Sequence, residues 1–176
     1  MDRMTVNAKL KRQAEILRRI HKSSSRRPYL ADRLMDHMGL SVAQVLTNKT
    51  HYNQTLGRIF EGLVLSAFID LPGFEPGLFN GRRQPADVVL GVDAIELKYS
   101  IADTSPQGEK YRQRRWELMD EGLNPVALVF RDCPNAPHIF RNWELHQGQA
   151  CIDYIERRSG QTFQQLLDAH SDFLDG

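Results

Sequence analysis

The segment PADVVLGVDAIELKYS, from Pro85 to Ser100, decides the fold of this chain. Two short apolar runs flank a Gly-containing turn at residues 91–93, a pattern typical of an antiparallel β-hairpin. The same segment contains three charged residues within its apolar runs, Asp87, Glu96 and Lys98. Burying a charge is costly unless it is paired, so these residues require a chemical explanation.

Alternation along the second run separates apolar from polar side chains. One face receives Ile95, Leu97 and Tyr99, and the other receives Glu96, Lys98 and Ser100. If the first run pairs with this strand through the turn, Asp87 lies near the level of Glu96 and Lys98. The sequence therefore predicts that the three charges converge.

Two neighbouring carboxylates repel each other, and a hard divalent cation such as Mg²⁺ resolves this repulsion. The natural ligands are Asp87, Glu96 and the backbone carbonyl of Leu97. The Lys98 ammonium would then orient or help deprotonate an attacking water and stabilise charge on a scissile phosphate. The alternative is a solvated strand face, on which a Glu-x-Lys pair has no special role.

The surrounding pattern is α/β. Residues 53–71 have apolar side chains at helical spacing with Glu61 in the middle, and residues 105–122 form a second helix after the hairpin. Its inward stripe is predicted to contain Tyr111, either Arg115 or Trp116, and Met119. Residues 124–132 are typical of a buried strand, and residues 138–143 suggest a shorter strand beside it. A crossover helix allows the last strand to run parallel to its neighbour.

The amino-terminal part of the chain is basic. The chain has 176 residues, 41% of them hydrophobic, which suits one domain with a small helical appendage. Its charge is nearly balanced overall, yet residues 1–30 contain nine basic and two acidic side chains. This arm either binds the DNA backbone or forms a dimerisation helix whose lysines stay in water.

Pro85, Asp87, Glu96 and Lys98 together resemble the signature of the PD-(D/E)xK nucleases, and ELKYS is especially similar to the corresponding strand of type II restriction endonucleases. The resemblance implies a restriction-endonuclease-like α-β-β-β-α-β core with a mixed sheet in residues 51–176, preceded by a helical region in residues 1–50. It also implies Mg²⁺ bound by Asp87 and Glu96, with Lys98 as the catalytic lysine. Glu61 resembles the additional helix acid of some members, and the alternative is an exposed charge on that helix.

The match departs from the family pattern in two respects. Ala86 separates Pro85 from Asp87, and only two of the three core hairpin strands are evident, so the third is placed in residues 73–80. Gln107 and Tyr111 have a Q-x-x-x-Y spacing similar to that of the exonuclease and helicase-nuclease branch of the superfamily.

Several polar residues are candidates for DNA contacts. Arg82, Arg83 and Gln84 precede the motif and are of types that read base edges, or they are simply turn residues. The remaining candidates are Ser100, Lys110 and Arg114, for which a solvated surface is the alternative.

The leading hypothesis is a sequence-specific, Mg²⁺-dependent endonuclease that cuts double-stranded DNA as a homodimer. The alternatives are a repair, recombination or phage nuclease that recognises DNA structure, and a non-catalytic DNA-binding protein with this fold. No apolar run is long enough to span a membrane, no signal peptide is evident, and the two cysteines form no cluster, so a cytoplasmic location without membrane association is expected.

Overall fold

The computed structural model describes residues 3–21, 33–37, 49–80, 83–101 and 107–171. Within these ranges, none of the helices has the length and apolar character needed to cross a membrane.

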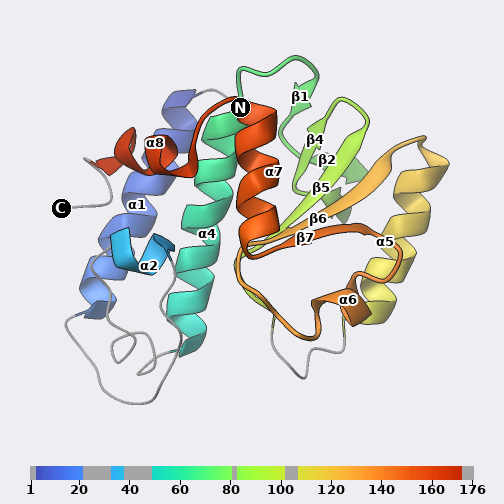
Figure 1. The fold of residues 1–176 in the computed structure, drawn as a ribbon, viewed down its shortest axis with the longest axis horizontal. Helices are drawn as coiled ribbons and strands as arrows, with labels where there is room; N and C mark the ends of the chain where they lie inside the picture. The colour runs from blue at the N-terminus through green and yellow to red at the C-terminus, as the bar shows by residue number, and fades with distance from the viewer. Residues whose placement is uncertain (1–2, 22–32, 38–48, 81–82, 102–106, 172–176) are drawn as a thin grey trace.

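The fold is of the α/β class, as the sequence predicts, and a mixed five-stranded sheet forms its centre (Figure 1). The strands lie in the order β1 (Phe74–Glu75), β4 (Val88–Leu90), β5 (Asp93–Lys98), β6 (Asn124–Val129) and β7 (Glu144–Gln147). The β1–β4 and β4–β5 pairs are antiparallel, whereas β5, β6 and β7 are parallel. A separate two-stranded sheet contains β2 (Leu78–Asn80) and β3 (Arg83–Ala86).

The hairpin between β4 and β5 sets the register on which the candidate site depends. Val88 pairs with Ile95 and Leu90 pairs with Asp93 across a tight turn. Gly91 adopts φ 65° in this turn, a left-handed conformation that suits glycine. The N–H group of Asp87 donates to the Ile95 carbonyl at 2.9 Å, so the pairing extends one residue beyond β4.

Helices cover both faces of the sheet (Figure 1). On one side, α4 (Lys49–Phe68) and α7 (Gln149–Ser159) share a core with Ile95, Leu97 and Tyr99. On the other side, α5 (Gly108–Asp120) and α6 (Ala136–Ile139) share a second core with Ala94. The two faces of β5 therefore divide as alternation predicts.

Two sequence-based predictions on the α5 side are wrong. The buried residues of α5 are Tyr111 and Leu118, whereas Trp116 and Met119 are 57% and 42% exposed. The residues expected to form a strand at 138–143 instead contribute to α6 and the turn after it, and the short strand β7 follows them. Phe140 and Trp143 of this segment pack their rings against Tyr111.

The basic amino-terminal helix α1 (Arg3–His21) lies along α4, and the short helices α2 (Arg33–His37) and α8 (Phe163–Asp168) complete this side (Figure 1). Val6, Leu10 and Ala14 of α1 are buried in the core that α4 shares with the sheet. Gly62 of α4 allows the close approach, because a Cβ atom there would lie 2.6 Å from Leu10 Cδ2. An ion pair between Arg3 and Asp70 shows that the two helices run antiparallel.

Replacement of Leu10 by alanine should lower the free energy of unfolding by about 2–5 kcal/mol, because it removes a fully buried side chain from the shared core. Met4→Ala is the matched control, since Met4 lies on the same helix and is 83% exposed; its effect should stay within about 0.5 kcal/mol. Chemical denaturation followed by circular dichroism measures both. Equal stability of the two variants would contradict the packing of α1 on α4.

Candidate functional site

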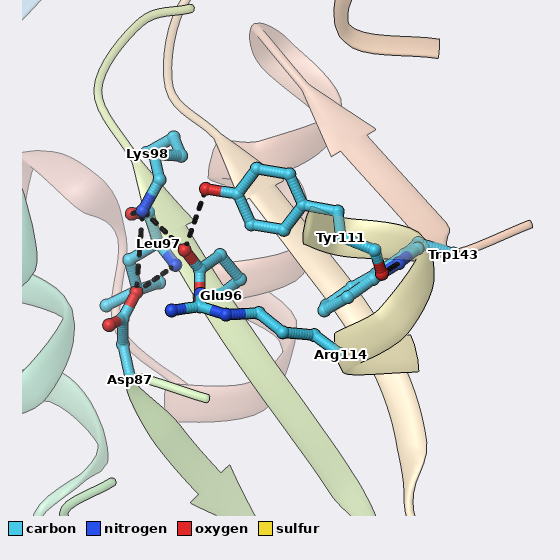
Figure 2. A network of polar contacts seen from close by, with 7 residues as sticks. All are labelled: Asp87, Glu96, Leu97, Lys98, Tyr111, Arg114 and Trp143. Atoms are coloured by element: carbon cyan, nitrogen blue, oxygen red, sulfur yellow. Dashed lines mark hydrogen bonds and ion pairs between the residues drawn. The ribbon is translucent and has the colours of Figure 1, made fainter. Parts of the chain in front are cut away.

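The three charged residues of the hairpin lie together in space (Figure 2). Glu96 projects from β5 toward α5 and is only 2% exposed. Asp87 stands just before β4, and its Oδ2 accepts a hydrogen bond of 2.8 Å from the Leu97 N–H group. This bond fixes the Asp87 carboxylate against the adjacent strand.

The ammonium of Lys98 occupies the point toward which three oxygen atoms are directed (Figure 2). Its Nζ lies 2.6 Å from Glu96 Oε1, 3.0 Å from the Leu97 carbonyl oxygen and 3.9 Å from Asp87 Oδ2. The hairpin therefore builds an oxygen-lined position for a cation, which the lysine of the same strand fills.

Helix α5 supplies further partners for the buried carboxylate. The Tyr111 hydroxyl donates to Glu96 Oε1 at 3.1 Å, and Arg114 Nη1 donates to Glu96 Oε2 at 2.9 Å. The Trp143 indole N–H donates to the Tyr111 carbonyl at 3.1 Å and so steadies this turn of the helix. Both oxygens of Glu96 are thus held by donors from the protein.

Burial and crowding change the acidities of these groups. Burial and the neighbouring Glu96 raise the pKa of Asp87 to about 7, although Lys98 and the Leu97 N–H group oppose the rise. Burial lowers the pKa of Lys98, but the carboxylates of Glu96 and Asp87 outweigh it and hold that pKa above its ordinary value. Burial, followed by Glu96, raises the pKa of Tyr111. At neutral pH Lys98 is therefore charged, and Asp87 is present in both its protonated and its ionised form.

This set of oxygen atoms suits Mg²⁺. Among the described residues no group of three or more His, Cys, Asp or Glu side chains that could hold a metal ion is present. The oxygen atoms around Lys98 come from two carboxylates and one backbone carbonyl. Mg²⁺ prefers oxygen ligands and commonly takes one or two carboxylates, leaving its other positions to water and phosphate. Asp87, Glu96 and the Leu97 carbonyl are the oxygen donors that could hold Mg²⁺ in place of the Lys98 ammonium.

No protein-family model matches this chain, and neither the curated proteins nor the solved structures include a match. Function therefore has to be inferred from the geometry of this site.

Glu61 lies on α4, close enough to the cluster for electrostatic interaction. Partial desolvation raises its pKa, Lys98 and Lys9 oppose the rise, and Glu96 adds to it. Its side chain remains exposed to solvent. Glu61 thus stands at the edge of the cluster, between Lys98 and the basic helix α1.

The structure describes some of the candidate DNA-binding residues and not others. Arg82 lies outside the described residues, and Arg83 and Gln84 belong to β3 with side chains outside the described set. Ser100 is half-buried just beyond the end of β5. Lys110 is exposed on α5, where desolvation and Arg114 lower its pKa.

The ion pair between Arg114 and Glu96 was not predicted from the sequence. Tyr111 and Arg114 are three residues apart, a spacing that puts both on one face of a helix. That spacing indicates a shared neighbour without identifying it. Lys9 was likewise assigned only to a basic arm and not to the surroundings of Glu61.

Asp87→Asn should stabilise the metal-free protein at alkaline pH. The folded pKa of Asp87 is about 7 against an ordinary value of 3.8, so its stabilising contribution is complete below about pH 4 and is lost as pH rises through about 7. Asparagine keeps an acceptor for the Leu97 N–H group and does not ionise. Relative to the wild type, the free energy of unfolding of the variant should increase by about 4 kcal/mol between about pH 4 and about pH 8.

Denaturant unfolding in a chelator, repeated across this pH range, measures the gain. Asp120→Asn provides the control, because it removes one carboxylate from an exposed position at the end of α5. Parallel profiles for the wild type and Asp87→Asn would be incompatible with a crowded, buried Asp87.

Proposed function

We propose that this protein is a Mg²⁺-dependent DNA endonuclease of the sequence-specific, type II restriction kind. The observation that carries the proposal is the convergence of Asp87 Oδ2, Glu96 Oε1 and the Leu97 carbonyl on one cation position, occupied by Lys98 Nζ. Metal-assisted phosphodiester hydrolysis can use carboxylates as metal ligands and a charged lysine beside them. The order of α4, β1, β4, β5, α5 and β6 is compatible with the α-β-β-β-α-β core of the PD-(D/E)xK nucleases.

Each residue has a distinct task in this proposal. Asp87, Glu96 and the Leu97 carbonyl would hold Mg²⁺, which when bound would neutralise the phosphate and stabilise the charge that develops during hydrolysis. Lys98, displaced from the oxygen cluster, would orient the attacking water and donate to the phosphate oxygens. Tyr111 keeps the Glu96 carboxylate oriented through its hydrogen bond.

Symmetric cleavage of a duplex requires two such centres. One chain provides one cluster of Asp87, Glu96 and Lys98, and one centre hydrolyses one strand. A homodimer with two-fold symmetry would place a centre on each strand and would match a palindromic sequence. We therefore propose double-stranded DNA as substrate and a second copy of the chain as partner.

A second candidate function is DNA binding without catalysis. Both oxygens of Glu96 already have protein partners, with Lys98 on one side and Arg114 on the other. Such an arrangement also suits a structural ion-pair cluster that holds α5 against the sheet. Cleavage assays separate the two functions.

Incubation of the purified protein with plasmid or phage DNA and Mg²⁺ should give discrete fragments. Asp87→Ala, Glu96→Ala and Lys98→Ala should each lower the cleavage rate about a thousandfold or more, because each removes a group that stabilises the transition state. Glu61→Ala should have a smaller effect, since Glu61 lies at the edge of the cluster. Gel electrophoresis of timed digests measures these rates.

The ends of the fragments decide the kind of nuclease. Sequencing should give one short symmetric motif at every cut, and EDTA should stop the reaction. Random ends, or digestion that proceeds from DNA termini, would instead support a structure-specific or exonucleolytic enzyme. Absence of cleavage on unmodified DNA from every source would favour the non-catalytic protein.

Lys98→Ala should separate metal binding from catalysis. Removing the ammonium vacates the cation position, so the variant should bind Mg²⁺ at least as tightly as the wild type even though it does not cleave. Asp87→Ala loses a ligand and should bind about tenfold more weakly or worse. Isothermal titration calorimetry without DNA measures both affinities. Equal weakening in the two variants would argue against the cation position described here.

A further inference from the structure

A groove of about 350 Å³ lies between α1 and α4, and Glu61 belongs to its lining. Its polar lining comes from both helices and consists of Lys9, Arg12, Gln13, Arg58 and Glu61. Three cations thus face one acid in a single hollow. Lys9, Arg12 and Arg58 are exposed residues.

Glu61 connects this groove with the catalytic cluster. Its carboxyl group interacts electrostatically with Lys98 and Glu96 on one side and with Lys9 and Arg58 on the other. Asp87 is in turn affected by the charge of Glu61. Glu61, which lines the groove, is therefore also an electrostatic neighbour of the oxygen-lined cation position.

The cations of the groove are held on a packed helix. The apolar side of α1, with Val6, Leu10 and Ala14, is buried against α4 and is not available as a dimerisation surface. Gly62 brings the two helices close together under Leu10, and the Arg3–Asp70 pair joins α1 to the end of α4. Lys9 and Arg12 are therefore fixed on the same rigid unit as Arg58 and Glu61.

We propose that Lys9, Arg12 and Arg58 bind backbone phosphates of the DNA strand that enters the site, next to the phosphate that is cut. This inference rests on the proposed function, because it takes DNA as the ligand. Exposed cations beside a site for phosphate chemistry suit a polyanionic backbone, and such contacts position the strand without reading its sequence. The basic arm then forms part of the substrate-binding surface.

The test measures DNA binding rather than cleavage. Fluorescence anisotropy with a short labelled duplex of random sequence, in EDTA, gives the dependence of log K on log salt. Each lost phosphate contact should lower the slope by about 0.9, so Arg12→Ala and Arg58→Ala should each flatten it by about that amount. Deleting the arm is unsuitable, because it would also remove buried core residues.

Lys11→Ala is the matched control. Lys11 is an exposed cation on the same helix, outside the lining of the groove, and its loss should leave the slope nearly unchanged. Arg12→Lys should restore most of the slope lost in Arg12→Ala, since it keeps the charge. Thermal unfolding by circular dichroism verifies that every variant is folded.

The outcomes distinguish this inference from the proposed function. If Lys11→Ala and Arg12→Ala change the salt slope equally, or if neither changes it, the proposed role of the groove in phosphate binding is wrong, even if the wild type cleaves DNA. If the salt slope depends on Arg12 and Arg58 but the protein never cleaves DNA, the result supports phosphate binding by the groove and contradicts the proposed nuclease activity. Failure of the wild type to bind DNA at low salt would overturn both.

Discussion

The carboxylate of Glu96 imposes the constraint on which the rest of the site depends. At 2% exposure it has lost nearly all contact with water, and an isolated buried charge of this kind would be strongly destabilising. Lys98, Arg114 and Tyr111 together satisfy both of its oxygens. Because two of these partners come from α5 and one from β5, satisfying Glu96 also fixes the crossover helix on the sheet. Stability and the proposed chemistry therefore depend on the same carboxylate.

The same contacts create competition among cations. Lys98 and Arg114 neutralise Glu96 in the absence of other ligands, and both are also groups that bind phosphate well. Under the proposed function, a DNA phosphate near the site would attract these side chains away from the carboxylate, and this would favour the entry of a divalent ion. Metal and DNA would then increase each other's affinity, since such coupling is reciprocal. Because the pKa of Asp87 is about 7, a proton also competes with these cations for its carboxylate near neutral pH.

Local pattern accounts for the parts of the site that the sequence predicts, and long-range packing for the parts it does not. The Gly91 turn and the two-residue period of β5 determine which face Glu96 and Lys98 occupy, so the hairpin and its charged face follow from neighbouring residues. The contact of Arg114 with Glu96 depends on how the crossover helix sits against the sheet.

The buried face of α5 was predicted wrongly for a related reason. Leu118 lies seven residues after Tyr111 and shares its face, whereas Met119 is rotated by about 100° from Leu118 and points outward. Residues 138–143 have strand-like composition, but the rings of Phe140 and Trp143 are used to cover Tyr111.

The basic helix α1 illustrates how tertiary packing bears on a question that composition leaves open. A basic amphipathic segment suits either a dimerisation surface or a DNA-binding arm, and its sequence alone is compatible with both. Val6, Leu10 and Ala14 recur every four residues and are buried on α4. This packing leaves Lys9 and Arg12 in the lining of the groove and Lys11 outside it. A cation fixed on a packed helix loses less conformational freedom on binding than one on a disordered arm, so each phosphate contact retains more of its favourable free energy. The burial of three apolar side chains thereby fixes which side of α1 presents Lys9 and Arg12.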